Sequence, residues 1–263
     1  MHPLFLTNRL DIAELCLWTF GLFFFGLVIY LRREDRREGY PLEDEVSGRP
    51  FGGVGTWLEE GHLKSYKLPF GLGTVMTPNH TRDTRRVLGR PAFAAGGAPL
   101  IPEGDPMLSG IGPGAYAERE KRPDLNMDGH PRIVPIGLAP TFMISRGDPD
   151  FRGWPVAGCD DRIAGIVTDL WVDTADRLIR YYEVELGTHS GAPGRKVLAP
   201  MFMSRVDKRN RAVRCDAICS DQFANVPAID APDRITLYEE ERVQGYYGGG
   251  WLYALPSRSE PLI

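Results

Sequence analysis

Two short clusters of acidic, histidine and arginine side chains have the composition of a proton-transfer site. Asp128 and His130 lie together on a probable turn, and Asp173, Asp176 and Arg180 flank a second turn between two apolar strands. Carboxylates and a histidine that lie close together raise one another's proton affinity and can pass protons near neutral pH. The clusters are therefore interpreted as a proton conduit; the alternative is a surface hairpin with ordinary solvated charges.

No other motif indicates catalysis or metal binding. The glycine-rich pieces lack the strand, spacing and helix of a nucleotide fingerprint, and neither GxSxG nor HExxH occurs. The 5 histidines are scattered without metal-ligand spacing, and the 4 cysteines form no CxxC pair. The sequence therefore predicts no catalytic residue and no metal site, and it predicts free, mostly buried thiols in a reducing compartment.

Short strands must position the second cluster, in a mainly β domain over residues 117–263. The predicted strands, rich in β-branched and aromatic residues, are Arg132–Ile136, Thr141–Ser145, Ile163–Val172, Leu178–Leu186, Lys196–Val206 and Arg211–Ile218. Several such strands in succession, separated by turn signals, predict a small antiparallel barrel or sandwich. One helix is predicted near residues 233–245, because Pro232 and Asp233 stand at its start and Gly245 just beyond its end.

The N-terminal apolar run predicts a single transmembrane helix over residues 12–31. Its 20 residues include 17 uncharged ones from Leu15 to Leu31, and a helix of this length spans roughly 30 Å, the thickness of a bilayer core. Four arginines follow it directly, namely Arg32, Arg33, Arg36 and Arg37, whereas only Arg9 precedes it. The positive-inside rule then places residues 1–11 in the periplasm and the bulk of the chain in the cytoplasm. A cleaved signal peptide would show the opposite order of charge.

The four arginines, together with Tyr40, form a candidate site for anionic lipid at the cytoplasmic leaflet. The alternative is that they act as a topology signal alone.

Residues 32–116 form a segment rich in glycine and proline. From Gly48 to Gly114, 22 of 67 residues are glycine or proline, which excludes long helices and regular central strands. A solvated linker is not expected to contain large apolar residues, and this segment contains several, such as Phe51, Trp57 and Tyr66. The segment is therefore predicted to lie extended against partner subunits, and low-complexity disorder is the alternative.

Composition excludes some classes of partner. Lysine and arginine total 31 and aspartate and glutamate total 35, for a formal net charge of −4. A nucleic-acid-binding surface is normally basic, so we expect no nucleic-acid partner. With 43% hydrophobic residues, the chain is expected to fold rather than to be disordered throughout.

The chain resembles the H subunit of the purple-bacterial photosynthetic reaction centre over most of its length. The segments that carry the resemblance are Gly21–Glu43, Gly104–Arg119, Asp128–Ile136, Gly147–Asp173, Arg180–Leu186 and Asp221–Ala254. The apolar span followed by RREDRREGYPLE is the most specific of them. The resemblance implies a cytoplasmic domain of the kind called a PRC barrel, which agrees with the predicted strands.

The resemblance implies a non-catalytic subunit in the bacterial inner (intracytoplasmic or chromatophore) membrane. Such a subunit caps the cytoplasmic face of the L and M subunits, stabilises the quinone sites and conducts protons to the secondary quinone. It implies that this chain binds no cofactor by itself, and that bacteriochlorophyll, bacteriopheophytin, quinones, non-haem iron and carotenoid lie on partner subunits. Further implied partners are a cytochrome subunit, core light-harvesting antenna chains and a phospholipid such as cardiolipin.

The resemblance also suggests roles for the residues of the two clusters. Asp128 and His130 match the surface acid and histidine through which protons enter, and Asp173 matches an acid inside the pathway. Asp176 stands where better-studied members carry glutamate, so its reach is shorter by one methylene; the alternative to a direct role is a contact bridged by a water molecule. Arg180 matches a basic residue close by.

Arg132 follows the first cluster and stands where some members carry a second histidine that helps to form an inhibitory metal site. A guanidinium has no lone pair to offer a metal at neutral pH. Zinc and cadmium are therefore expected to bind weakly at this surface.

Other functions remain open at the level of sequence. A single-span adaptor with a PRC-barrel domain would share the anchor and the extended segment and would differ only in its partner. A membrane-anchored enzyme would need a clustered nucleophile or metal set that the motifs do not provide. An RNA-binding barrel is disfavoured by the net charge.

Overall fold

The computed structural model describes residues 5–7, 10–40, 42–44, 47, 49, 61–79 and 83–259. The chain forms two compact units, which are described separately. The first comprises residues 1–84 and 95–97, and the second comprises residues 85–94 and 98–263.

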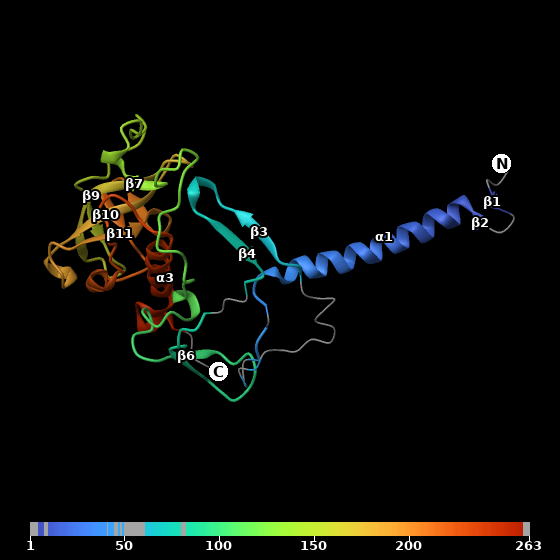
Figure 1. Cartoon of the computed structure of the whole chain (residues 1–263). Coiled ribbons are helices and arrows are strands. Elements are labelled where there is room, and N and C mark those ends of the chain that lie inside the picture. Colours follow the sequence, from blue (N-terminus) through green and yellow to red (C-terminus); the bar gives the residue numbers. More distant parts are fainter. Residues whose placement is uncertain are drawn as a thin grey trace. The chain divides into compact units, whose positions relative to one another are not determined.

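The first unit contains the predicted N-terminal apolar helix, α1, which spans Ile12–Glu34 and runs unbroken in Figure 1. Asp11 caps it by accepting a hydrogen bond from the N–H of Ala13 at 3.0 Å. Arg32 and Arg33 occupy its last turn, where positive charge is favourable. The helix buries none of its residues, and it is long and apolar enough to cross a membrane. Its apolar surface therefore needs lipid or another protein around it.

The remaining elements of the first unit are short, as expected for a glycine- and proline-rich segment. Strands β1 (Phe5–Thr7) and β2 (Leu10–Asp11) pair before the helix, and β3 (Lys64–Lys67) and β4 (Thr74–Thr77) form a hairpin. Tyr66 and Phe70 of this hairpin are about half exposed. Phe51 and Trp57, which contributed to the prediction of a partner-bound segment, lie outside the described residues.

The second unit contains a mainly β domain with one C-terminal helix, as predicted. Its strands are β7 (Ile133–Pro135), β8 (Pro155–Ala157), β9 (Ile163–Asp173), β10 (Leu178–Leu186), β11 (Lys196–Pro200), β12 (Arg205–Asp207) and β13 (Ala212–Arg214). They form one sheet in the order β11-β10-β9-β8-β13-β12, and β7 also pairs with β9. A separate hairpin joins β5 (Gly89–Pro91) to β6 (Leu100–Pro102). Within the described residues the sheet does not close, because its edge strands β11 and β12 do not pair.

Several strand predictions need correction. Thr141–Ser145 forms no strand, and β8 was not predicted because it has only 3 residues. The segment Lys196–Val206 divides at Pro200 into β11, a 3-10 turn and β12, since proline lacks the N–H that a ladder needs. Of Arg211–Ile218, only residues 212–214 pair as a strand.

The C-terminal helix α3 spans Leu237–Tyr253, so both predicted ends were wrong. Its true N-cap is Thr236, which forms a capping box with Glu239. Gly245 does not end the helix. Gly248 and Gly250 continue it and allow close approach of neighbouring backbone: a Cβ at Gly250 would lie 2.5 Å from the carbonyl oxygen of Ala217.

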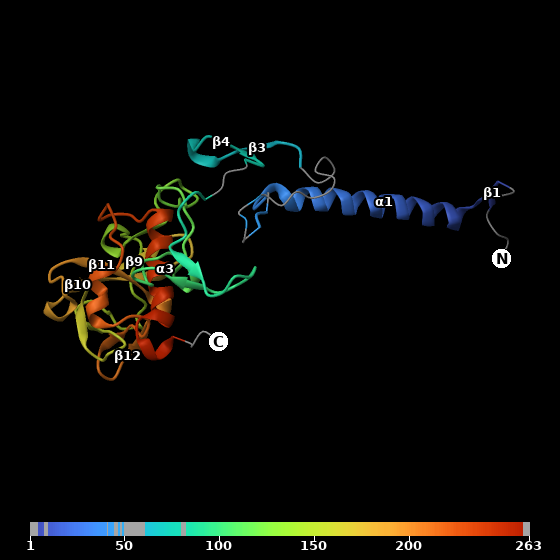
Figure 2. The same cartoon turned by 90° about the horizontal axis from the view of Figure 1, so that it is seen from below.

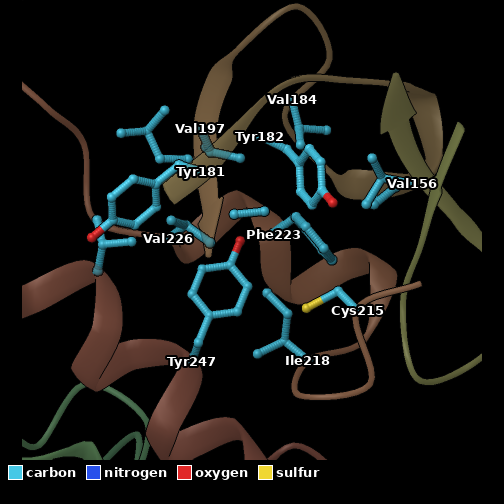
Figure 3. Packing of buried hydrophobic residues seen from close by; sticks show 14 of the residues in the cluster. Val156, Tyr181, Tyr182, Val184, Val197, Cys215, Ile218, Phe223, Val226 and Tyr247 are labelled. Atoms are coloured by element: carbon cyan, nitrogen blue, oxygen red, sulfur yellow. The ribbon is translucent and has the colours of Figure 1, made fainter. Parts of the chain in front are cut away.

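The core of the second unit lies between α3 and the sheet, and both Figure 1 and Figure 2 show α3 beside β9, β10 and β11. Figure 3 shows Tyr247 of α3 pointing into the cluster formed by Tyr182, Phe223 and Ile218. Trp171 and these aromatic side chains are almost completely buried. Burying side chains of this size contributes about 1.5–3 kcal/mol each, so this cluster holds the strands that carry Asp173.

The prediction of free thiols was wrong for two of the four cysteines. Cys159 and Cys219 form a disulfide, although 60 residues separate them in the sequence. The fold brings them together because Gly158 lies directly against the backbone at Ser220, where a Cβ would meet the nitrogen atom at 2.5 Å. The carboxylate of Asp160 also accepts hydrogen bonds from the N–H and hydroxyl of Ser220. Cys16 and Cys215 are free, and only Cys215 is buried.

Candidate functional site

Asp173 lies at the end of the longest strand, β9, where the chain turns towards β10. In the sheet it stands opposite Leu178 of β10 and opposite Ile133 of β7. Because β7 begins directly after Arg132, this pairing brings the arginine to the carboxylate. The side chain of Asp173 is completely buried.

The Asp173 carboxylate is saturated with donors. It accepts hydrogen bonds from Arg132 Nε at 3.0 Å, from Arg180 Nε at 3.2 Å, and from the N–H groups of Ala175 and Asp176 at 3.0 and 2.9 Å. Burial by itself would raise the pKa of Asp173, but the Arg132 guanidinium and the backbone donors outweigh it and lower the pKa. Asp173 is therefore an anion at neutral pH.

Arg132 connects three carboxylates. Besides Asp173, it contacts Asp176 Oδ2 through Nη2 at 2.6 Å and Asp124 Oδ2 through Nη1 at 3.3 Å. Arg180 Nη2 lies 3.8 Å from Asp176 Oδ2. Hydrogen bonding to Asp173 raises the pKa of Arg132 above its already high value, so the guanidinium remains charged. We call Asp124, Arg132, Asp173, Asp176 and Arg180 the charge cluster; its formal charge is −1.

Asp128 and His130 form a separate, exposed group on a turn at residues 126–130. The side-chain oxygen of Asn126 accepts hydrogen bonds from the N–H groups of both residues, at 3.0 and 3.1 Å. Its amide nitrogen donates to Thr174 Oγ1 at 3.3 Å, and Thr174 adjoins Asp173. Among the described residues no hydrogen bond joins the side chains of Asp128 or His130 to the charge cluster. The turn itself is tied to Thr174 through the side chain of Asn126.

A polar cavity of about 300 Å³ adjoins the charge cluster. It is lined by Arg119, Asp124, Arg132, Ile133, Arg180, Leu237, Glu240, Glu241 and Gln244. The segment before Asp124 is tied to the start of α3, because the N–H of Leu237 donates to the carbonyl of Arg122 at 2.9 Å. Burial raises the pKa of Glu240 above its ordinary value.

No pattern in the sequence indicated Asp124, Asn126 or Glu240 as site residues. Asp124 lies just before the turn and Asn126 begins it, and their polar type alone is ordinary for a loop. Glu240 is one of three consecutive glutamates on α3. Nothing in that run distinguishes the residue that the fold turns towards the cavity, since this depends on how α3 packs.

The predicted lipid-binding arginines lie where α1 ends, all within the first unit. Arg37 donates to both oxygens of Glu34 and to the carbonyl oxygen of Thr77, so its charge is already paired. Arg33 contacts His62 Nε2 at 3.0 Å, and the Arg36 guanidinium lies 5.3 Å from the centre of the Tyr40 ring. Arg32 is exposed.

A cavity of about 280 Å³ lies against this end of α1. Its walls include Gly26, Ile29 and Tyr30, and its polar rim includes Arg33 and Lys64. The lining also includes Glu34, which is ion-paired with Lys64 at 2.8 Å. Apolar side chains next to basic ones suit an acyl chain with an anionic headgroup.

The charge cluster is suited to an electrostatic role. Its ionised groups are held in place by one another and by backbone donors, and it adjoins a polar cavity that can admit water. Among the described residues, no group of three or more histidine, cysteine or acidic side chains could hold a metal ion.

Comparison with protein families gives two matches that together cover most of the chain. A family model described as the photosynthetic reaction centre, H-chain N-terminal region, matches residues 4–138. A PRC-barrel domain model matches residues 143–222, which confirms the predicted fold class. Asp128, His130 and Arg132 fall within the first match, and Asp173 and Arg180 within the second.

Proposed function

The chain belongs to the photosynthetic reaction centre H-chain family, and from this membership we propose that its charge cluster conducts protons to the secondary quinone during light-driven electron transfer. In this proposal the chain also caps the cytoplasmic face of the L and M subunits and stabilises the quinone sites. The family is that of a non-catalytic subunit associated with L and M, so the contribution of this chain is structural and electrostatic.

The observation that carries the proposal is that an exposed acid and histidine lie on a turn that is hydrogen-bonded, through Asn126, to the residue beside a buried carboxylate. Asp128 and His130 are exposed, Asn126 joins their turn to Thr174, and Asp173 is buried next to it. Electrons delivered to a quinone in a low-dielectric site must be balanced by protons. A chain of hydrogen-bonded groups and water can carry those protons inwards.

In this proposal the surface residues, Asp173 and Asp176 have distinct tasks. Asp128 and His130 collect protons at the surface, since both side chains are exposed. Asp173, held between Arg132 and Arg180, supplies a fixed negative potential that favours a proton nearby. Asp176 lies at the edge of the cluster, with its side chain half exposed to solvent and paired with Arg132.

Other expected components follow from the same proposal. The pigments, quinones, non-haem iron and carotenoid would lie on the partner subunits, and a cytochrome subunit and antenna chains would belong to the same complex. An anionic phospholipid such as cardiolipin would bind at the end of α1, where Arg33 and Lys64 border the apolar cavity. The chain would lie in the bacterial inner membrane with its N-terminus in the periplasm.

The experiment that tests the proposal is purification of the chain from its native membrane in mild detergent. We expect L and M chains and the absorption bands of bacteriochlorophyll to accompany it. Flash-induced proton uptake by that complex should then slow when Asp128 and His130 are both replaced, by asparagine and glutamine. A colourless complex with other chains would favour a single-span adaptor instead, and proton uptake at the wild-type rate would contradict conduction through this surface.

A further inference from the structure

The polar cavity beside the charge cluster contains one carboxylate in an environment unlike that of its neighbours. We infer that Glu240 of α3 is the group of this site that takes up and releases a proton, while Asp173 and its two arginines stay charged. The inference rests on the proposed function and adds a residue to it. On uptake the Glu240 carboxylate becomes a carboxyl group, and release to water in the cavity restores it.

Asp173 is unsuited to this task because each of its hydrogen-bond donors stabilises its ionised form. Two guanidiniums and two backbone N–H groups donate to its oxygens. Protonation would leave Arg132 and Arg180 without their shared acceptor in a buried site, which is costly. Asp173 therefore acts as a fixed charge.

The partners of Glu240 are neutral. Gln244 Nε2 donates to Glu240 Oε1 at 3.0 Å and to the Tyr181 hydroxyl oxygen at 2.9 Å, and the Tyr181 hydroxyl also hydrogen-bonds Glu240. Among the described residues Glu240 forms no ion pair, because Arg180 pairs with Asp173 and Asp176 while Arg119 pairs with Glu241. Neutral donors stabilise a carboxylate less than a guanidinium does, so the ionised form of Glu240 is less favoured than that of Asp173.

The charges that face Glu240 come from three segments. Arg180 on β10 favours the carboxylate, whereas Asp124 and Asp173 favour the carboxyl form. Arg119 and Arg132 also line the cavity, and Glu241 lies next in sequence. Burial is the largest of these influences and raises the pKa of Glu240, in agreement with the inference from geometry.

Glu240 lines a cavity through which a proton can pass between the surface and the charge cluster. Arg132 and Arg180 line the cavity as well as bonding Asp173. Asp124, whose side chain is 43% exposed, lies at the outer side of the same cavity. A cavity of about 300 Å³ has room for several water molecules that could carry a proton between these groups.

The test uses the intact detergent-solubilised complex and infrared spectroscopy. The C=O stretch of a protonated carboxyl group, identified by its shift in D2O, is followed as pH rises from the ordinary value of 4.5. Glu240→Gln should remove a band that persists above that pH. Glu241→Gln is the matched control on the same helix, and it should retain the band because Glu241 is ion-paired with Arg119.

Tyr181→Phe provides a second variant in which the carboxyl group itself is kept. Loss of the Tyr181 hydroxyl removes a hydrogen bond that lowers the pKa of Glu240. The same infrared band should then titrate at a higher pH than in the wild type. This shift distinguishes a proton on Glu240 from a structural effect of Glu240→Gln, and an unshifted band would contradict the inference.

Flash-induced proton uptake separates the inference from the proposed function. We expect Glu240→Gln to slow uptake at least several-fold, and Glu185→Gln, an exposed carboxylate change on β10, to leave it unchanged. A wild-type rate in Glu240→Gln together with slow uptake in the Asp128 and His130 double variant would overturn the inference alone. Wild-type rates in both would overturn the proposed function as well.

Discussion

At the scale of single residues, the site shows how environment gives two carboxylates opposite behaviour. Asp173 is buried but surrounded by guanidinium and backbone donors, and its pKa is lowered. Glu240 is partly buried with neutral partners, and burial raises its pKa. The difference lies in the partners, because desolvation acts in the same direction on both groups.

Asp173→Asn is expected to slow proton uptake and to destabilise the chain by about 1–3 kcal/mol, because Arg132 and Arg180 lose the charge that they share. The pKa of Asp173 is below 3.8 in the folded chain, so its contribution is present above pH 3.8 and is lost as pH falls through the lower folded value. Denaturant unfolding of the full chain in detergent measures this. Stability curves of wild type and variant should converge in acid.

The control for this measurement is Asp233→Asn, an exposed carboxylate change; within the described part of the chain this side chain pairs only with the adjacent Arg234. It should change stability by less than about 0.5 kcal/mol at any pH. If Asp173→Asn showed the same small effect, the charge cluster would contribute little to the fold.

At the scale of elements, α3 determines where Glu240 lies. The helix begins at a capping box, in which Glu239 accepts hydrogen bonds from the N–H and hydroxyl of Thr236 at 2.7 and 2.6 Å. It then packs closely through glycines, so that Gly245 and Gly248 approach the backbone of residues 113–115. Glycine weakens an isolated helix, and here the lost propensity is offset by the close contact that it permits.

Gly250→Ala is expected to destabilise the second unit by about 1–3 kcal/mol, the range for forcing an extra methyl group into a packed site. The new Cβ would lie 2.5 Å from both Ala217 O and Ile218 Cγ2. Thermal unfolding followed by circular dichroism measures the change. Gly147→Ala is the control, because a Cβ there meets nothing within 4 Å, and equal unfolding temperatures for the two variants would show that α3 tolerates displacement.

At the scale of the whole molecule, the chain joins an apolar helix that buries none of its residues to a folded domain with its own aromatic core. The first unit has little core of its own: its described large apolar residues, such as Phe20, Phe23 and Tyr66, are mostly exposed. A subunit with this division of surfaces is stable in place only when lipid and partner chains cover the apolar helix.

Phe23→Arg is expected to weaken membrane anchoring, because an arginine near the middle of a span costs about 2.5–3.5 kcal/mol on insertion. Phe23 is 62% exposed and lies near the middle of α1. The measurement is the fraction of chain that stays with membranes after alkaline extraction, in cells that lack the partner subunits. Phe23→Leu should behave as the wild type, and full retention of Phe23→Arg would show that α1 alone does not anchor the chain.

Local patterns in the sequence determined the elements whose signals are contained in a few consecutive residues. The apolar run predicted α1, the alternation of β-branched and aromatic residues predicted β9 and β10, and the specific segments predicted the family. Long-range packing decided the rest. Sheet pairing, with no local signal, brought Arg132 to Asp173. The close approach of Gly158 to the backbone at Ser220 brought Cys159 to Cys219. The N-terminal end of α3 has a local signal, the capping box of Thr236 and Glu239. The packing of α3 set its C-terminal end and the position of Glu240, because a contact between residues distant in sequence depends on the whole fold and leaves no periodicity to read.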